Sequence, residues 1–485
     1  MRWITLILLF VQFSPAQTLR QRIESAMEAS PGARGAFWGM EAVELETGTE
    51  LYQTNPNRFF VPASATKLVT TALALARLGP DYRFETTVCA DAPPDAAGRI
   101  AGELRLVGGG DPMLTVHAAP YKKGQIQGDP LQAIESLAEQ VCARGVRRID
   151  GDIVGDDTRY TWEPYPEGWS AGDGVWDYGA PVSALAVNDN TVRVTLRAAA
   201  RGIPALSLSP ALEFYTIDNR VRAGPGLENK VFVERLPGSR QLRIWGTMSS
   251  DPPSTIPLLL AVHDSALYAA HALADALARR GVSIGGRAAA RHRFANEDET
   301  AEAGGVVLAR RTSPPLVEAL RVIDKVSQNL QAEMVLREVG RVRRGKGSRE
   351  SGIDEMRAFL SEAGIGANEY DFADGSGLSR LGLVTPGALC KLLRYMYVSP
   401  HRETWLSLLP LGGEDGTLST RFNGRRDGRR IRAKTGSLTH VAALAGYAES
   451  KTRGMVAFAI LANNFNAPGS EIRAVIDRIA LMLAE

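Results

Sequence analysis

The pattern of apolar and polar residues predicts a chain whose character changes twice along its length. Apolar residues recur at helical spacing towards both ends, whereas strand-like alternation dominates the middle, from about 181 to 260. A helix should begin near Ser64, in V-P-A-S-A-T-K-L-V-T-T-A-L-A-L. The other segments with helical spacing are 17–29, 131–145, 264–280, 315–340 and 469–484.

Strand patterns fall into three groups. Near the N-terminus, an alternating stretch is interrupted by T-G-T-E at 47–50, which predicts a hairpin. The middle contains N-T-V-R-V-T-L, N-K-V-F-V-E-R-L and R-Q-L-R-I-W-G. Three strands are expected near the C-terminus, at 430–436, 441–449 and 454–462. Because helices flank a β-rich middle, the pattern favours an α/β domain into which this middle is inserted.

Residues 1–16 have the layout of a secretory signal peptide. One arginine precedes a short apolar run, and Ser14 and Ala16 are small residues suited to cleavage before Gln17. The run is shorter than the roughly 20 apolar residues that a membrane span needs. An uncleaved anchor is the alternative. We therefore expect an exported protein with no membrane segment after cleavage.

Composition excludes several classes of function. The 485 residues suggest two to four domains. The net charge of +2, without a basic stripe that carries aromatic residues, argues against a nucleic-acid partner. Six histidines show no metal-ligand spacing, so neither a metal nor another cofactor is expected. The three cysteines, Cys89, Cys142 and Cys390, are too few for a disulfide framework. We expect buried free thiols, with a Cys89–Cys142 bridge as the alternative.

Ser64 and Lys67 form the first candidate catalytic motif, S-x-x-K. Helical spacing of three places both side chains on one face, within hydrogen-bonding reach. Apolar neighbours would desolvate the lysine and lower its pKa, and a neutral amine can accept the serine proton. On its own, however, this pattern is explained as well by a helix cap beside a lysine that reaches solvent.

Two further motifs favour the catalytic interpretation. S-Q-N, from Ser327 to Asn329, lies in a helical pattern, and K-T-G-S, from Lys434 to Ser437, ends a predicted strand. The order S-x-x-K, S-x-N, K-T-G is the acyl-serine motif set of penicillin-binding proteins and class A β-lactamases. Here Gln328 occupies the position of the usual aspartate.

Four other segments narrow this resemblance. They are V-G-G-G-D-P at 107–112, Y-G-A-P-V-S-A-L-A-V-N-D-N at 178–190, D-G-S-G-L-S-R at 374–380 and L-P-L-G-G-E-D-G-T-L at 409–418. From about residue 20 onward, the chain resembles the class C low-molecular-mass penicillin-binding proteins, which are exported D-alanyl-D-alanine carboxypeptidases and endopeptidases.

The resemblance implies a multi-domain α/β fold. A transpeptidase-like domain, an antiparallel sheet with helices on both faces, would comprise 17–88 and 306–485. It would carry two nested, β-rich insertions, a second domain at 89–165 and 283–305 and a third at 166–282. The implied partners are peptidoglycan stem peptides, of the diaminopimelate type, and β-lactams; the oligomeric state stays open.

The resemblance also implies catalytic roles. Ser64 would attack the carbonyl carbon before a terminal D-alanine, with Lys67 as general base. Ser327 would relay a proton to the leaving nitrogen, and Asn329 would hold the substrate amide and Lys67. The backbone N–H groups of Ser64 and Ser437 would form the oxyanion hole. The substrate carboxylate would be bound by the third motif, which comprises Lys434, Thr435, Gly436 and Ser437.

Two positions concern substrate preference. Arg380 matches the arginine that faces the distal carboxylate of diaminopimelate in such enzymes, a task that suits a guanidinium. Asp157 resembles the acid that faces the amino group, with the adjacent Asp156 as the alternative and Tyr160 or Trp162 beside the same pocket. His440 has no role in this mechanism.

Two other functions fit the same motifs less well. A β-lactamase or esterase would need a deacylating base, for which no clear motif is present. A non-catalytic muropeptide-binding protein would not need Lys67.

Overall fold

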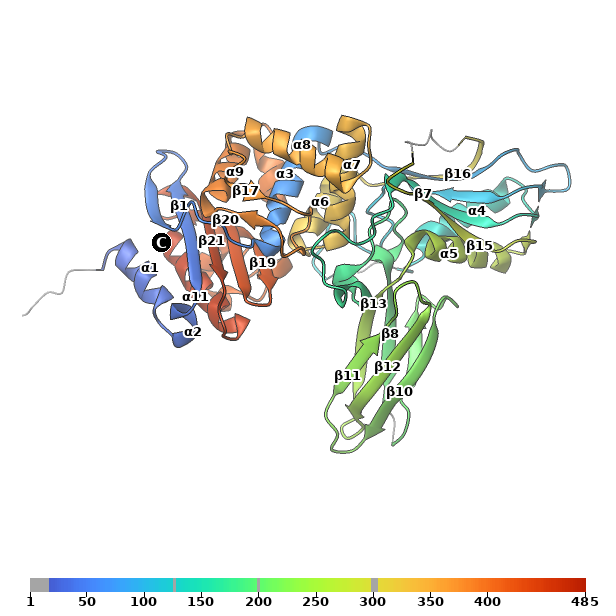
Figure 1. The fold of residues 1–485 in the computed structure, drawn as a ribbon, viewed down its shortest axis with the longest axis horizontal. Coiled ribbons are helices and arrows are strands. Elements are labelled where there is room, and N and C mark those ends of the chain that lie inside the picture. Colours follow the sequence, from blue (N-terminus) through green and yellow to red (C-terminus); the bar gives the residue numbers. More distant parts are fainter. Residues whose placement is uncertain (1–16, 125–127, 199–200, 298–303) are drawn as a thin grey trace, which may run out of the picture.

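The computed structural model describes residues 17–485 except 125–127, 199–200 and 298–303. It contains three regions built on separate sheets (Figure 1). The expected signal peptide, residues 1–16, lies outside the described residues. Within the described part of the chain, no helix has the length and apolar character to cross a membrane.

The first region is an antiparallel five-stranded sheet, to which both ends of the chain contribute. Its order is β19-β20-β21-β1-β2. Ala442 and Leu444 of β20 face one core, and Ala443 and Ala445 face another. Because both faces are buried, β20 is apolar from Val441 to Ala448 instead of alternating in polarity. The strands are β1 (Phe37–Glu44), β2 (Glu50–Thr54), β19 (Ile431–Leu438), β20 (Val441–Ser450) and β21 (Gly454–Asn463).

Helices cover both faces of this sheet. One core contains residues of α1 (Leu19–Met27), α2 (Pro31–Arg34) and α11 (Gly469–Leu483). The opposite core contains residues of α3 (Thr66–Leu78), α6 (Leu316–Lys325), α7 (Asn329–Arg344), α8 (Arg349–Glu362), α9 (Pro386–Val398) and α10 (Arg402–Leu408). A short ladder beside them joins β17 (Tyr370–Asp371) to β18 (Leu383–Val384). The predicted fold class is therefore confirmed.

The second region is a mixed five-stranded sheet in the order β15-β7-β5-β3-β16, together with a small sheet in the order β14-β6-β4. Its core includes apolar residues of α4 (Gln132–Ala143) and α5 (Ser265–Arg279). The strands are β3 (Glu85–Ala90), β4 (Arg99–Ile100), β5 (Leu104–Val107), β6 (Arg148–Ile149), β7 (Ile153–Thr161), β14 (Ser283–Ile284), β15 (Ala288–Arg293) and β16 (Val306–Thr312).

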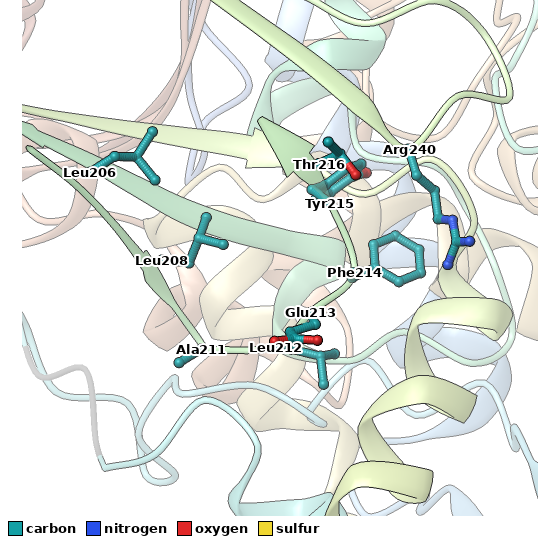
Figure 2. A pocket seen from close by; sticks show the side chains of 9 residues that line it. All are labelled: Leu206, Leu208, Ala211, Leu212, Glu213, Phe214, Tyr215, Thr216 and Arg240. Carbon is teal, nitrogen blue, oxygen red and sulfur yellow. The ribbon is translucent and has the colours of Figure 1, made fainter. Parts of the chain in front are cut away.

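The third region consists of two three-stranded sheets that share one apolar core and project from the rest of the molecule (Figure 1). The strands are β8 (Thr191–Arg197), β9 (Ala205–Ser209), β10 (Thr216–Gly224), β11 (Lys230–Glu234), β12 (Gln241–Ser249) and β13 (Thr255–Ala261). An open hollow of about 770 Å³ lies where this region meets α5, with Phe214 and Arg240 among its lining residues (Figure 2).

Sheet membership bears on the expected domain boundaries. The expected third domain, 166–282, includes α5, but α5 packs with α4 in the core of the second region. Strands β3 and β16, which adjoin the expected boundaries near 88 and 306, pair with each other in the second sheet. The boundaries stay a prediction, and the pairing favours ends for the second region near 85 and 312.

Two local expectations differ from the structure. The helix expected over 315–340 is two helices, because α6 ends at Lys325 and α7 begins at Asn329. Between them Ser327 has φ 69°, a left-handed conformation that a continuous right-handed helix excludes. The K-T-G-S motif lies within β19 and does not end it.

All three cysteines carry free thiols; Cys89 and Cys390 are buried and Cys142 is half-buried.

The remaining helical elements are short 3-10 turns. They are η1 (Ala63–Ala65), η2 (Asp173–Val175), η3 (Asp177–Gly179), η4 (Asn188–Asn190), η5 (Gly416–Leu418), η6 (Phe422–Gly424) and η7 (Arg426–Arg430).

Candidate active site

Ser64 and Lys67 meet at the junction of η1 and α3. The Lys67 amine lies 3.0 Å from Ser64 Oγ, and the lysine is completely buried. The amine also donates to Asn329 Oδ1 at 2.5 Å and to the backbone oxygen of Ser376 at 2.6 Å. Burial, and then the positive charge of Lys434, lower the pKa of Lys67 well below its usual value.

The three contacts of Lys67 fix the direction of its lone pair. A neutral amine has two N–H donors, and two of its partners, the Asn329 and Ser376 oxygens, can only accept. The lone pair is therefore left for the hydroxyl of Ser64, which can donate its proton. This arrangement is the one that a serine nucleophile and a lysine base require.

Asn329 and Ser327 enter the site from the break between α6 and α7. The Asn329 amide nitrogen donates to the backbone oxygen of Tyr178 at 2.8 Å, and this bond sets the amide so that its oxygen faces Lys67. The strained backbone at Ser327 turns its hydroxyl towards β19, where Lys434 donates to Ser327 Oγ at 2.9 Å.

Lys434 is completely buried and also donates to the backbone oxygen of Thr435 at 2.9 Å. Burial lowers the pKa of Lys434 to about 8, against the opposing charge of the Asp324 carboxylate. Thr435 Oγ1 donates to Thr417 Oγ1 at 2.8 Å. Gly436 lies against η1, since a Cβ there would be 2.5 Å from the backbone oxygen of Pro62.

A cavity of about 490 Å³ opens in front of these groups. Lys67, Lys434 and Thr435 are not among its lining residues. Arg380 stands at the mouth and donates to the backbone oxygen of Thr439 at 3.1 Å. The lining residues are Ser64, Ser170, Asp173, Tyr178, Ser327, Asn329, Gly377, Leu378, Arg380, Ser437, Leu438 and Thr439.

The structure does not bring Asp157 to this cavity. The Asp157 carboxylate is buried in the second region and accepts from Ser183 Oγ at 2.8 Å and from His292 Nδ1 at 2.9 Å. Asp156 is likewise buried and accepts from Thr158 Oγ1 at 2.7 Å. The acid that lines the cavity is Asp173, in η2.

The neighbours that the sequence suggested for Asp157 are also engaged elsewhere. Tyr160 donates to the Glu338 carboxylate at 2.9 Å, and Trp162 stacks on His292 with ring centroids 3.7 Å apart. His440 is exposed, and its Nδ1 lies 2.7 Å from the backbone oxygen of Phe465. None of these three side chains lines the cavity.

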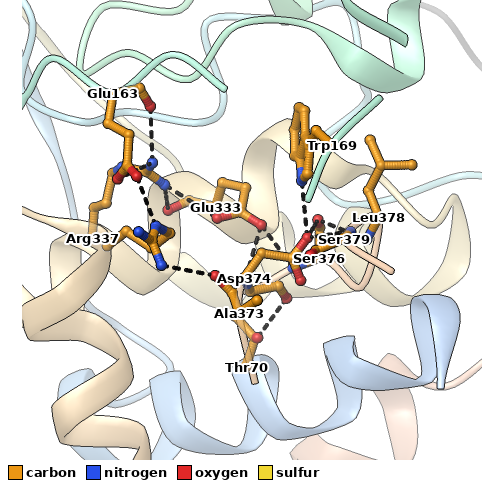
Figure 3. A network of polar contacts seen from close by, with 12 residues as sticks. Thr70, Glu163, Trp169, Glu333, Arg337, Ala373, Asp374, Ser376, Leu378 and Ser379 are labelled. Carbon is orange, nitrogen blue, oxygen red and sulfur yellow. Dashed lines mark hydrogen bonds and ion pairs between the residues drawn. The ribbon is translucent and has the colours of Figure 1, made fainter. Parts of the chain in front are cut away.

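A buried polar network supports the loop at 374–380 (Figure 3). The Asp374 carboxylate accepts from Trp169 Nε1 at 2.9 Å and from the backbone N–H of Gly377 and Ser379, each at 2.8 Å. The Glu333 carboxylate accepts from the backbone N–H of Ser376 at 2.8 Å. The loop is thereby held so that its Ser376 oxygen meets Lys67.

Sequence reasoning missed these supports. Burial raises the pKa of Glu333 to about 7, although Arg337 lies 3.1 Å away. Asp374 and Tyr178 fall in segments that carried the family resemblance, which was the available signal. Glu333, Trp169 and Asp173 had no comparable signal, because each is defined by contacts with residues far along the chain.

The fold and this cleft define the chain as a low-molecular-mass penicillin-binding protein. The chain belongs to the D-Ala-D-Ala carboxypeptidase 3 (S13) family, whose model matches residues 19–484. The predicted family and the predicted serine carboxypeptidase activity are thus confirmed.

Individual proteins support this assignment. A D-alanyl-D-alanine carboxypeptidase of an Actinomadura species is 33% identical over 480 residues, covering 96% of this chain and 84% of the relative. A carboxypeptidase DacB of Mycolicibacterium smegmatis is 28% identical, covering 91% and 78%. The crystal structure of penicillin-binding protein 4 from Haemophilus influenzae has the same fold, with a TM-score of 0.81 at 23% identity, covering 95% of this chain and 97% of that one.

Proposed function

We propose that in this D-Ala-D-Ala carboxypeptidase Ser64 is the nucleophile and Lys67 its general base. The observation that carries the proposal is the set of Lys67 contacts, which commit both amine hydrogens to acceptors and leave the lone pair for Ser64. In acylation, the Ser64 proton passes to Lys67 while Oγ attacks the carbonyl carbon of the penultimate D-alanine.

The other motif residues complete the acylation step. The Ser327 hydroxyl, held by Lys434, gives its proton to the leaving nitrogen and receives in return the proton that Lys67 took from Ser64, so that D-alanine departs as a neutral amine and Lys67 is neutral again. Lys434 supplies the positive charge for the terminal carboxylate, and the Ser437 hydroxyl donates to it. The Thr435 hydroxyl can donate as well once its proton turns from Thr417 to the substrate. Since β19 is an edge strand, its free side faces the cleft, where the Ser437 N–H joins that of Ser64 as the oxyanion hole.

Deacylation returns the enzyme to its starting state. A water molecule loses a proton to Lys67 and attacks the ester carbonyl, and the Ser64 oxygen takes the proton back as it leaves. The same acyl-enzyme serves a carboxypeptidase and an endopeptidase, because the two reactions differ only in the amine that departs. A β-lactam forms the equivalent ester with Ser64.

We further propose a diaminopimelate-type stem peptide as the substrate. Arg380 and Asp173 line the same cavity with opposite charges, as an amino-acid side chain that ends in both an amino and a carboxyl group requires. Asp173 takes the role that the sequence suggested for Asp157.

The catalytic assignment is tested with a fluorescent penicillin. The folded protein should acquire one covalent label, which peptide mass spectrometry places on Ser64. Ser64→Ala should lose this label, with a fall in turnover of up to about a million-fold. A label on another residue, or none on the folded protein, would refute the assignment.

We also propose that the protein works outside the cytoplasm, since its substrate is cell-wall peptide and residues 1–16 have a signal-peptide pattern. N-terminal sequencing of protein recovered from the extracytoplasmic fraction should begin at Gln17. An intact Met1 with all protein in the cytoplasm would contradict this proposal.

A further inference from the structure

Asp324 is a buried acid that the mechanism above does not use. It lies on α6, one helical turn before Ser327, and its side chain is 0% exposed. Neither of its carboxylate oxygens has a hydrogen-bond partner. The hydroxyl of the neighbouring Thr71 donates instead to the backbone oxygen of Lys67, at 2.8 Å. Burial of an unpartnered carboxylate is costly, so its presence behind an active site needs an explanation.

The charges around Asp324 supply an explanation for this buried carboxylate. The positive charges that act on it, strongest first, belong to Lys434, Lys67 and Lys325. Lys325 is already committed to Asp415, at 2.5 Å. Among the described residues, neither Lys67 nor Lys434 forms an ion pair within 4.0 Å. The negative charge of Asp324 therefore acts mainly on these two lysines.

The two lysines depend on Asp324 to different degrees. Burial disfavours the charged form of Lys434, and Asp324 is the one acid that opposes this effect. For Lys67, Asp324 comes after Asp374 and Glu333 among the opposing acids. Asp374 is tied to backbone N–H groups and Glu333 to Arg337, so both act from fixed positions.

We propose that Asp324 is the buried counter-charge that keeps the proton on Lys434 while Lys67 stays neutral. It is a positioning residue, because it acts through Lys434 and does not line the cavity. Without it, two desolvated lysines would face each other with no nearby free anion, and Lys434 would release its proton. The cleft would then lose the cation that the substrate carboxylate needs.

The directions of the two pKa shifts agree with this geometry. Lys434 has its pKa lowered to about 8, and burial raises the pKa of Asp324 to about 7. The charge of each group opposes the shift that burial causes in the other. Removal of the Asp324 charge should therefore move the loss of the Lys434 proton, and with it the alkaline limb of activity, to lower pH.

The inference rests on the proposed function and is tested through the pH profile of the enzyme. The rate of Ser64 acylation by benzylpenicillin, and D-alanine release from a diaminopimelate-containing pentapeptide, are measured from pH 5 to 10 on the whole protein. Asp324→Asn should move the alkaline limb down by about one pH unit, which is about a tenfold loss on that limb. Activity on the acidic side should change much less.

Further variants separate charge from packing. Asp324→Leu should displace the alkaline limb to lower pH by the same amount. It replaces Asp324→Asn in the test if that variant does not fold. Asp324→Glu retains the charge and should restore the limb. Because arginine keeps its proton, Asp324→Asn combined with Lys434→Arg should recover alkaline activity relative to Asp324→Asn alone. Asp427→Asn removes a half-buried acid that contacts Lys451 and should leave the profile unchanged.

An alkaline limb that stays in place in both uncharged variants would overturn the inference, as would a loss that is equal at every pH. Failure of the proposed function would look different, because the wild-type protein itself would then carry no penicillin on Ser64.

Discussion

At the scale of single residues, the partners of each buried lysine distinguish its chemistry from that of the others. Lys67, Lys434 and Lys325 are all nearly or fully buried, yet they have different partners. Lys325 has a carboxylate at 2.5 Å, whereas Lys67 has neutral oxygens and a serine hydroxyl. Neutral partners do not offset the desolvation of an ammonium, which lowers the pKa of Lys67 and supports its proposed role as a base.

Lys67→Arg tests this reasoning directly. Arginine keeps the length and the donors but does not deprotonate in a protein, so Ser64 should lose its base. We expect acylation by penicillin to fall by about 10²- to 10⁴-fold. Stopped-flow fluorescence measures the rate, and circular dichroism checks the fold. Wild-type rates in this variant would show that another group takes the Ser64 proton.

Asp173→Asn tests the substrate pocket. The variant loses the negative charge that we propose binds the substrate amino group. We expect kcat/KM for a diaminopimelate-containing peptide to fall by at least about tenfold, since a charge-assisted hydrogen bond contributes about 1.5–3 kcal/mol. Acylation by benzylpenicillin, which lacks that group, should change little. Asp157→Asn serves as the comparison, and a larger selective effect there would restore the earlier assignment.

At the scale of elements, the site is assembled where helix ends and loops meet. Ser327 and Asn329 occupy the gap between α6 and α7, and the loop at 374–380 presses against η1. Gly377 makes this approach feasible: it has φ +75°, and a Cβ there would lie 1.9 Å from the backbone oxygen of Ala63. The loop could not hold Lys67 through Ser376 if that contact were lost.

Gly377→Ala tests this contact, and Gly364→Ala, which lies outside the loop, serves as its control. Gly364 has φ +74° and no atom within 4 Å of a Cβ, so its substitution introduces backbone strain without a clash. Both variants should lose about 1 kcal/mol of stability from the left-handed conformation. Only Gly377→Ala should also lose penicillin acylation, because η1 and Ser64 must shift. Equal acylation rates in the two variants would contradict this account.

At the scale of the whole molecule, a buried acid joins the first and second regions. Glu338 of α7 is 0% exposed and accepts from Tyr160 at 2.9 Å and from Arg159 at 2.6 Å, both on β7. It also accepts from Tyr82, at 2.5 Å. Because α7 carries Asn329 at its start, this junction links the position of the second region to the active site.

Glu338→Gln should destabilise the junction strongly. The variant leaves the Arg159 charge without its partner, and loss of one member of a buried pair costs about 3–5 kcal/mol. Thermal or urea denaturation should show the loss. Glu350→Gln, an exposed acid on α8, should stay within about 0.5 kcal/mol of the wild type. A similar small effect for Glu338→Gln would mean that the junction contributes little.

The sequence predicted the elements better than the junctions between them. The hairpin of β1 and β2, the three C-terminal strands and helices α1, α4, α5 and α11 follow their hydrophobic patterns, because the period of such a pattern reflects local geometry. The break at Ser327 was missed, since V-I-D-K-V-S-Q-N-L keeps helical spacing across it. The structure places Asp157 on β7, away from the cavity, and Asp173 of η2 in the cavity lining, because sequence distance does not report which of the two lies near Ser64.

By itself, the sequence determined most of the secondary structure, the order of the three motifs and the family, because each of these depends on short stretches of residues. Only the tertiary structure decided that Asp173 faces the cleft, that Glu333 and Asp374 hold the 374–380 loop, and that Asp324 is left unpaired behind two lysines. The physical reason is that proximity and desolvation arise from the packing of segments hundreds of residues apart, which no local pattern records.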